Sequence, residues 1–268
     1  MQLEGLRCGV GIWLPLLAFV ASCGIACPAS QTAPLRCARA GIDEYAAVRY
    51  VIDGDTVVLA DRRKVRLIGI NAPEVGREGR RSQALAEPAR GALKRLLTGQ
   101  SRVGLQYDRQ QRDRFGRQLS HLLLRDGTNV QAWLLERGLA TALIFPPNLD
   151  YVECYRDAER AARRSNLGLW RLARYKPVDA GRVAGLPRGY RVVTGRISGV
   201  RATRASQWLN FGPAFAVRIQ RTDLRYFRHL DFHHWVGKLV SMRGWLSRRN
   251  GKTYMRLRHP AQLDATPG

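Results

Sequence analysis

Three short segments of the sequence carry the residue types needed to hydrolyse a phosphodiester bond. They are Asp53–Thr56 (DGDT), Arg66–Glu74 (RLIGINAPE) and Asp113–Arg117 (DRFGR). Carboxylate and amide oxygens suit a hard divalent cation, and an unneutralised carboxylate can take a proton from water. Guanidinium groups can bind two phosphate oxygens at once. The chemistry requires that these segments meet in one pocket.

The first segment offers oxygen ligands for a cation. Asp53 and Asp55 flank Gly54, which permits a tight turn that lets the two carboxylates converge. Asn71 adds an amide oxygen, and Ala72 can contribute only its backbone carbonyl. Taken alone, Asp-Gly is also common in hairpins, so an ordinary turn remains the alternative.

The other two segments supply a candidate base and two candidate phosphate ligands. Glu74 follows Pro73, whose ring fixes the approach of the chain, and it could deprotonate an attacking water. Arg66 lies in an apolar run, so its side chain must face away from the core or into a polar cleft. Arg117 follows Gly116 in a basic turn and could reach the same phosphate from another side.

Alternating and helical patterns predict the elements that would position these residues. Alternation and β-branched residues predict strands, and apolar stripes bounded by Pro, Asn or Gly predict helices. The predicted strands cover 48–52, 57–59, 65–70, 103–107 and 119–123, and the predicted helices cover 88–97, 130–137 and 151–166. A second β-rich region follows, with strands at 191–200, 208–212, 215–219, 239–245 and 254–257 and a hairpin turn at Arg249–Lys252.

Composition favours a folded protein with a polyanionic partner. The chain has 268 residues, of which 45% are hydrophobic, so a packed core is feasible. Lys and Arg number 45 against 21 Asp and Glu, which gives a net charge of +24. A field of that sign favours nucleic acid, although solubility alone is the simpler alternative.

The N-terminal residues have the pattern of an export signal. Arg7 precedes an apolar run over 10–21, which is too short to span a membrane comfortably. The run ends at Val20–Cys23, a pattern that precedes a lipidated cysteine, so Cys23 is a candidate for a membrane tether. Cleavage at a small residue further on remains open. We expect a periplasmic or extracellular protein, with a membrane-anchored lipoprotein as the variant.

Export would place the remaining cysteines in an oxidising compartment. These are Cys27, Cys37 and Cys154. A Cys37–Cys154 bridge would tie the start of the fold to a later helix, but pairing cannot be read from the sequence alone. No Cys-x-x-Cys pair occurs, so a structural zinc site is not expected.

The stretch 46–170 resembles the thermonuclease family, whose type member is staphylococcal nuclease, and holds all three segments in the family's order. The resemblance implies a mainly β, α+β fold: an OB-type five-stranded barrel with three helices. It also implies hydrolysis of DNA and RNA at the 5′-oxygen bond, leaving 3′-phosphates. For the site, it implies Ca²⁺ held by Asp55, Asn71 and the Ala72 carbonyl with Asp53 nearby, water oriented or activated by Glu74, and phosphate held by Arg66 and Arg117.

The sequence departs from the family at two places. Asn71 replaces an aspartate of the type member, so Ca²⁺ should bind more weakly, because affinity follows the charge of the ligands. Leu143 and Phe145 lie where the type member has tyrosines beside the nucleotide; Phe145 can still stack on a base, whereas Leu143 cannot. We therefore expect an active site with altered nucleotide contacts.

The predicted organisation has five parts: a signal over 1–29, a lead-in segment over 30–45, the nuclease-like domain over 46–170, a linker over 171–187 and a small β-barrel over 188–264. The last part resembles OB-type nucleic-acid-binding barrels in Trp208–Gly212 and Val240–Trp245. Its aromatic residues could stack bases or simply form the core; they are Trp208, Phe211, Phe215 and Trp245.

Together these features favour an exported, Ca²⁺-dependent nuclease that cuts DNA and RNA with little sugar specificity. No protein partner is predicted. Two alternatives remain at this point. One is a non-catalytic nucleic-acid-binding protein with two OB-type barrels, its metal site weakened by Asn71. The other is a membrane-tethered interaction protein.

Overall fold

The structure, a computed structural model, describes Cys37 and residues 41–265. All of these residues belong to one compact unit. The predicted signal over 1–29, the candidate lipidation site Cys23, and Cys27 lie outside the described residues.

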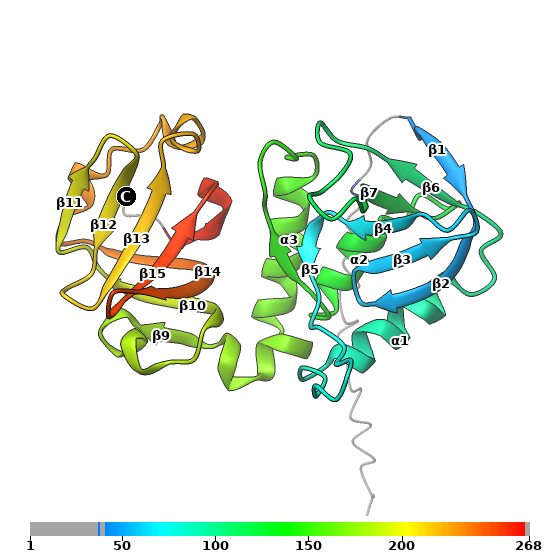
Figure 1. Ribbon diagram of the computed structural model, residues 1–268, viewed down its shortest axis with the longest axis horizontal. Coiled ribbons are helices and arrows are strands. Elements are labelled where there is room, and N and C mark those ends of the chain that lie inside the picture. The colour runs from blue at the N-terminus through cyan, green and yellow to red at the C-terminus, as the bar shows by residue number, and fades with distance from the viewer. Residues whose placement is uncertain (1–36, 38–40, 266–268) are drawn as a thin grey trace, which may run out of the picture. The chain divides into compact units, whose positions relative to one another are not determined.

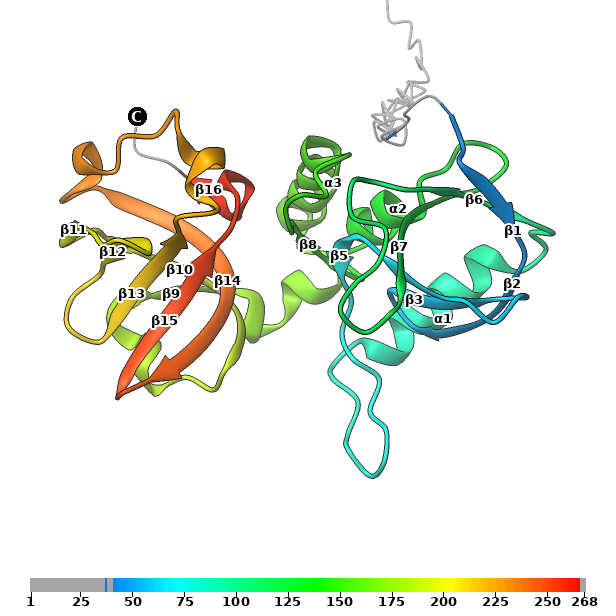
Figure 2. The ribbon, with the colours of Figure 1, turned by 45° about the horizontal axis from the view of Figure 1, so that its top comes forward.

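A curled six-stranded sheet forms the first half of the fold (Figures 1 and 2). Its order is β1-β6-β7-β4-β3-β2, and only the β4–β7 pair is parallel. The strands are β1 (Glu44–Ala46), β2 (Val48–Asp53), β3 (Thr56–Leu59), β4 (Lys64–Leu67), β6 (Val103–Gln106) and β7 (Gln118–Leu123).

The sheet has six strands where the predicted barrel has five, because one strand is divided in two. Its edge strands β1 and β2 follow one another in the chain with only Ala47 between them. One bent strand therefore supplies both edges, and the sheet curls without closing through hydrogen bonds. The prediction of a mainly β fold with helices is confirmed, but among the described strands the sheet is open.

Helices and a two-stranded sheet cover this curled sheet. They are α1 (Ala86–Leu97), α2 (Val130–Glu136), α3 (Val152–Arg164), and β5 (Gly69–Asn71) paired with β8 (Thr141–Leu143). Asn129 caps α2 as predicted, because its side-chain oxygen accepts the Ala132 N–H at 3.1 Å. The apolar faces of these elements share one core, which includes Val57, Leu59, Val65, Leu67, Leu93, Leu105, Leu122, Leu134 and Leu135.

A disulfide fixes the start of the fold to α3. It joins Cys37 and Cys154, whose Cα atoms lie 5.8 Å apart, and this confirms the pairing considered from the sequence. The bond spans a sequence separation of 117 residues. In the chain-entropy model, a crosslink that closes a loop of that length restricts the unfolded chain and stabilises the fold by about 5 kcal/mol.

The second half is an eight-stranded sheet, also open within the described residues. Its order is β11-β12-β13-β15-β14-β10-β9, with β16 paired to β14. The strands are β9 (Pro177–Asp179), β10 (Gly189–Arg196), β11 (Gly199–Ala202), β12 (Ser206–Asn210), β13 (Phe215–Gln220), β14 (Leu239–Arg249), β15 (Lys252–Leu257) and β16 (Leu263–Ala265). The predicted hairpin is confirmed: Asn250 and Gly251 join β14 to β15 with φ of 49° and 73°.

The segment 171–187, predicted as a linker, is built into this second sheet. Strand β9 runs parallel to β10, and the 3₁₀ helix η3 (Ala180–Gly185) places Ala180 and Val183 in the core of the second sheet. A three-residue strand and a 3₁₀ turn leave no periodic pattern, so neither element could be predicted from the sequence.

A buried ion-pair network connects α3 with the second sheet. Glu159 in α3 is fully buried and lies 2.8 Å from the guanidinium of Arg243 in β14, itself only 3% exposed. Asp264 pairs with Arg243 and also with Arg163, at 2.8 Å from the latter. Burial raises the pKa of Glu159, while Arg243 and the Ala142 N–H act in the opposite direction. Loss of one member would leave this buried network with an unbalanced charge.

We expect Glu159→Ala to destabilise the protein by about 3–5 kcal/mol, because the buried network would then hold two guanidinium groups, Arg243 and Arg163, against Asp264 alone. Urea unfolding of the purified protein measures this. The control is Glu153→Ala in the same helix: Glu153 pairs with Arg156 but is 71% exposed, so its loss should cost less than about 1 kcal/mol. Equal effects of the two substitutions would contradict the buried ion pair.

Candidate active site

The turn between β2 and β3 brings the first segment against the loop after β5. The Asp53 carboxylate accepts the Asp55 N–H at 3.0 Å, which closes the turn. A Cβ on Gly54 would lie 2.6 Å from the Cβ of Ala72 and 2.9 Å from that of Ala89. The glycine is therefore required for close packing, and not for the positive φ that a tight turn suggests.

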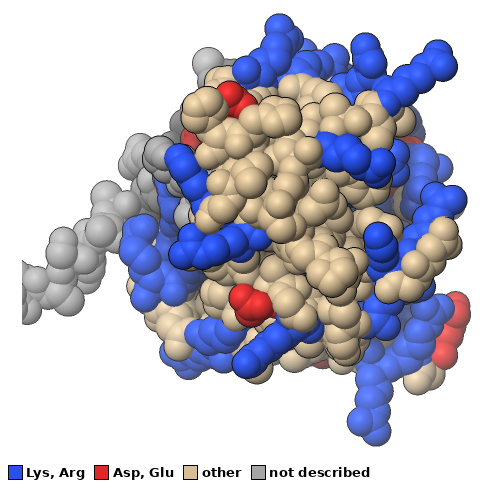
Figure 3. Space-filling view, turned by 90° about the vertical axis from the view of Figure 1, so that its left-hand side faces the viewer, with Lys and Arg blue, Asp and Glu red and all other residues tan. Residues whose placement is uncertain are grey.

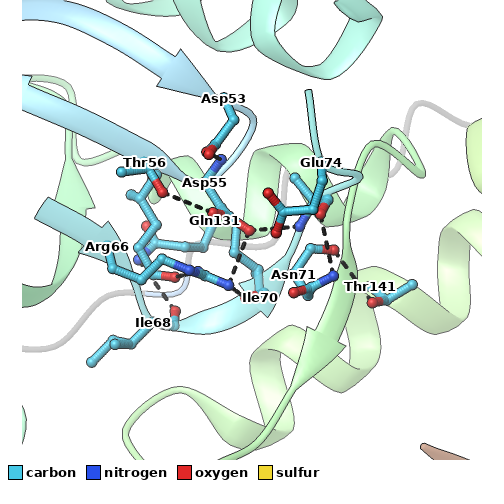
Figure 4. Close-up of polar contacts among 12 residues, drawn as sticks. Asp53, Asp55, Thr56, Arg66, Ile68, Ile70, Asn71, Glu74, Gln131 and Thr141 are labelled. Carbon is cyan, nitrogen blue, oxygen red and sulfur yellow. Dashed lines mark hydrogen bonds and ion pairs between the residues drawn. The ribbon is translucent and has the colours of Figure 1, made fainter. Parts of the chain in front are cut away.

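The Asp55 carboxylate lies at the centre of the site (Figure 4). It is 3% exposed and accepts hydrogen bonds from the Ala72 N–H at 2.8 Å and the Thr56 hydroxyl at 3.1 Å. The Arg66 guanidinium lies 3.0 Å from the same oxygen that Ala72 contacts. Burial raises the pKa of Asp55 to about 6, in spite of Arg66 and these hydrogen bonds. Arg66 and the hydrogen bonds therefore do not fully offset the free-energy cost of burying the ionised Asp55 carboxylate.

Arg66 faces a polar pocket, as its place in an apolar strand predicted. Its side chain is 13% exposed and donates to the backbone oxygens of Leu67 and Ile70, the latter at 3.0 Å. Together with the ion pair to Asp55, these bonds fix the guanidinium in one orientation.

Asn71 and Ala72 lie beside Asp55 at the end of β5. The side-chain amide of Asn71 donates to the Ala72 carbonyl at 3.2 Å. The backbone carbonyl of Asn71 accepts from the Thr141 hydroxyl at 3.3 Å. With Asp55 they form an all-oxygen donor set, which matches the chemistry of a hard cation. Across the described residues, no group of three or more His, Cys, Asp or Glu side chains is placed to hold a metal. The donor set of Asp55, Asn71 and the Ala72 carbonyl therefore has the oxygen atoms that a hard cation prefers, but only Asp55 in it carries a negative charge.

Glu74 lies at the edge of an open pocket of about 610 Å³. Its backbone is tied to Gln83, whose N–H donates to the Glu74 carbonyl at 2.9 Å. The side chain is exposed and makes no ion pair among the described residues. Asp53, Lys64 and Arg117 line the same pocket. The structure thus brings the candidate base and one candidate phosphate ligand to one cavity.

Arg117 forms the boundary between this pocket and a second one of about 550 Å³, which Arg66 also lines. Its Nε donates to Asp113 at 2.8 Å, and Asp113 also accepts the backbone N–H groups of Phe115 and Arg117. Burial raises the pKa of Asp113, but these bonds outweigh it, so the pKa lies below its usual value. The turn is thereby fixed with the Arg117 side chain 31% exposed.

The second pocket holds both residues expected to contact the nucleotide. Leu143 and Phe145 line it, and Phe145 is 45% exposed. Three further residues of its wall had no role assigned from the sequence: Arg114 and Phe115, which lie inside the predicted segment Asp113–Arg117, and Arg258, which lies in none of the predicted segments. Phe115 is 70% exposed and lies under the Arg114 guanidinium; an aromatic residue in a basic turn was a signal for it. Arg258 follows β15, and nothing in the sequence links it to this pocket.

Comparisons with known proteins match the region that carries this site. The family model described as staphylococcal nuclease homologue matches residues 64–172. The thermonuclease of Staphylococcus intermedius is 37% identical over 127 residues, 46% of this chain and 74% of that protein. That of Staphylococcus hyicus is 34% identical over 130 residues, 47% and 75% of the two chains. Endonuclease YncB of Bacillus subtilis is 33% identical over 129 residues, 46% and 60%.

Because a Cβ at position 54 would collide with Ala72 and Ala89, we expect Gly54→Ala to cost about 1–3 kcal/mol of stability. Urea unfolding measures the loss. The matched control is Gly91→Ala inside α1, where a Cβ meets only the end of the Arg95 side chain; it should stabilise by about 0.5–1 kcal/mol. If Gly54→Ala were also stabilising, the close approach of the turn to Ala72 would be wrong.

Proposed function

This chain belongs to the staphylococcal nuclease family and is an endonuclease that hydrolyses phosphodiester bonds, and on that premise we propose that it cuts DNA and RNA, uses Ca²⁺ and is exported. The observation that carries the proposal is the arrangement around Arg117. Glu74 shares one pocket with it, and Arg66, held against Asp55, shares the adjoining one.

Glu74 is the proposed base. Its carboxylate is exposed at the pocket edge and has no cation partner among the described residues, so it can accept a proton from a water in that pocket. The non-catalytic alternative is not retained, because the chain belongs to a family of nucleases and keeps a candidate base and two arginines around adjoining pockets.

Arg66 and Arg117 are the proposed ligands of the scissile phosphate. Each is oriented by a carboxylate, Asp55 for Arg66 and Asp113 for Arg117, before any substrate arrives. Donors that are already oriented stabilise developing charge without reorganising during the reaction, which is the main source of electrostatic catalysis.

Asp55, Asn71 and the Ala72 carbonyl are the proposed Ca²⁺ ligands, with Asp53 close by. The raised pKa of Asp55 supports this, because a buried carboxylate short of positive charge is stabilised by a cation. Such an ion supplies charge that neutralises a phosphate oxygen. Asn71 in place of a carboxylate lowers the ligand charge, so we propose weaker Ca²⁺ affinity than an all-carboxylate site would have.

Both DNA and RNA are proposed as substrates because the groups assigned to the site contact phosphate, which the two polymers share. The net charge of +24 supports a polyanionic partner. Blue Lys and Arg side chains clearly outnumber red acidic ones on the face drawn in Figure 3.

Export is proposed from the apolar run over 10–21 and is supported by the Cys37–Cys154 disulfide, since such bonds persist in oxidising compartments. Within the described residues, no helix has the length and apolar character needed to cross a membrane. Lipid attachment at Cys23 is retained as a variant of this proposal.

We expect Glu74→Gln to lower kcat on a labelled oligonucleotide by roughly two orders of magnitude or more, because the amide cannot accept the proton. Oligonucleotide binding should persist, since the arginines are unchanged. The control is Glu87→Gln on the surface of α1, which lies in neither pocket and should retain full turnover. Wild-type turnover in a folded Glu74→Gln protein would exclude Glu74 as the base.

Removal of metal tests the cofactor. We expect excess EDTA to abolish cleavage and added Ca²⁺ to restore it. Asn71→Asp should lower the half-saturating Ca²⁺ concentration on the order of tenfold, because it adds a carboxylate to the donor set. Asn148→Asp, in the second pocket, controls for added charge alone and should give no such gain. Cleavage that persists in EDTA would rule out the metal requirement.

A further inference from the structure

The second pocket is built from two parts of the chain that are distant in sequence. Arg66, Arg117, Leu143 and Phe145 lie on the elements that carry the active site, whereas Arg258 lies between β15 and the 3₁₀ helix η6 (Pro260–Gln262) of the second sheet. This residue falls outside the region that matches the family model.

Arg258 covers one face of the Phe145 ring. Its guanidinium carbon lies 4.5 Å from the ring centroid. A nucleobase placed between the two would need about 3.5 Å on each side, or roughly 7 Å in all. That face is therefore closed to a base, and Phe145 serves there to support a guanidinium.

The guanidinium of Arg258 has no acidic group in direct contact within the part of the chain that the structure describes. Among the described residues it makes no ion pair, whereas its neighbour Arg256 lies 2.7 Å from Asp223. Burial lowers the pKa of Arg258, and Arg256 adds to this effect; Asp223, which Arg256 already contacts, opposes it without reversing it. A half-buried cation of this kind is stabilised when an anion enters the pocket that it lines.

The pocket itself selects for an anion. Four arginines line it, Arg66, Arg114, Arg117 and Arg258, against the single acidic residue Asp113. The Asp113 carboxylate is already engaged by Arg117. A phosphodiester matches this charge and can accept paired hydrogen bonds from a guanidinium.

Packing fixes Arg258 at this place. Its backbone N–H donates to the Gln262 side chain at 2.7 Å, within the capped turn of η6. Ala261 in that turn packs in one apolar cluster with Ile144 and Val152, and Ile144 directly precedes Phe145. Arg258 is thus held by the same contacts that hold the pocket wall.

We propose that Arg258 binds a phosphate of the substrate strand adjacent to the one that is cut, so that the second sheet completes the substrate site. Arg66 and Arg117 hold the scissile phosphate in the proposed function, on which this inference rests. The strand then continues along the second pocket, where Arg258 takes the next phosphate from the surface of Phe145.

The test measures binding apart from cleavage. The full chain carrying Glu74→Gln is titrated, with EDTA present, against a short fluorescein-labelled single-stranded DNA, and anisotropy gives Kd over a range of salt concentrations. We expect added Arg258→Ala to raise Kd roughly five- to tenfold and to reduce the slope of log affinity against log salt by about 0.7, the value for one lost phosphate contact on a single strand.

Two further variants sharpen the result. Arg258→Lys keeps the charge and should keep the salt slope, with part of the affinity lost because an ammonium cannot stack and bind as a planar fork. Arg249→Ala removes an exposed arginine at the end of β14, outside both pockets, and should change Kd less than about twofold.

In the protein with Glu74 intact, Arg258→Ala should raise KM by the same factor and leave kcat unchanged. An unaltered Kd, or a raised Kd with an unaltered salt slope, would overturn the role of Arg258 while the nuclease activity stands. Failure of the unmodified protein to cut any polynucleotide would instead overturn the proposed function. If Arg258→Ala does not fold, as judged by circular dichroism, Arg258→Lys decides: a reduced salt slope in that variant would contradict the phosphate contact.

Discussion

The buried carboxylate of Asp55 is the interaction on which the arrangement of the active site depends. It accepts the Ala72 N–H and the Thr56 hydroxyl, and it pairs with Arg66. These groups come from the start of β3, from β4 and from the loop after β5, so one side chain joins three parts of the chain. A buried charge is tolerated only while its partners are in place. The burial of Asp55 therefore positions Arg66 and the Ala72 carbonyl together, and the close packing at Gly54 makes that burial possible.

Around this centre, the charged residues differ in whether a partner already neutralises them. Arg66 and Arg117 are each held by a carboxylate, and Arg66 also by two backbone carbonyls, which suits groups that must be oriented in advance. Glu74 is exposed and lacks a cation partner among the described residues, which suits a group that must exchange a proton. Carboxylates thus take different roles in this site, since those paired with Arg66 and Arg117 orient a guanidinium, whereas that of Glu74 is available to exchange a proton. These surroundings cannot be read from a sequence motif.

Features that depend on nearby residues in the sequence, such as a helix cap, a hairpin turn and the orientation of a charged side chain in an apolar strand, were predicted. Asn129 caps its helix, Asn250 and Gly251 form the hairpin turn, and Arg66 turns to a polar pocket because an apolar strand leaves it no other place. Features set by distant contacts were not predictable. The break at Ala47 follows from the curl of the sheet, and η3 lies in the second core without any periodic pattern. From the sequence, Gly54 was expected to be needed because it permits a tight turn. In the structure, glycine is needed there because a Cβ would collide with Ala72, in the loop after β5.

The aromatic residues of the second sheet divide between the two interpretations that the sequence left open. Phe211 and Phe215 are buried in its core, while Trp245 is 39% exposed and Trp208 is partly exposed beneath Arg218. The link between this sheet and α3 has a different character, because it is a buried ion pair between Glu159 and Arg243. In proteins generally, well-packed apolar side chains can often replace a buried ion pair without loss of stability. The ion pair instead allows only one alignment of β14 with α3, since a displaced Arg243 would leave the buried charge of Glu159 uncompensated. We infer that the register matters because it sets the place of Arg258 on Phe145.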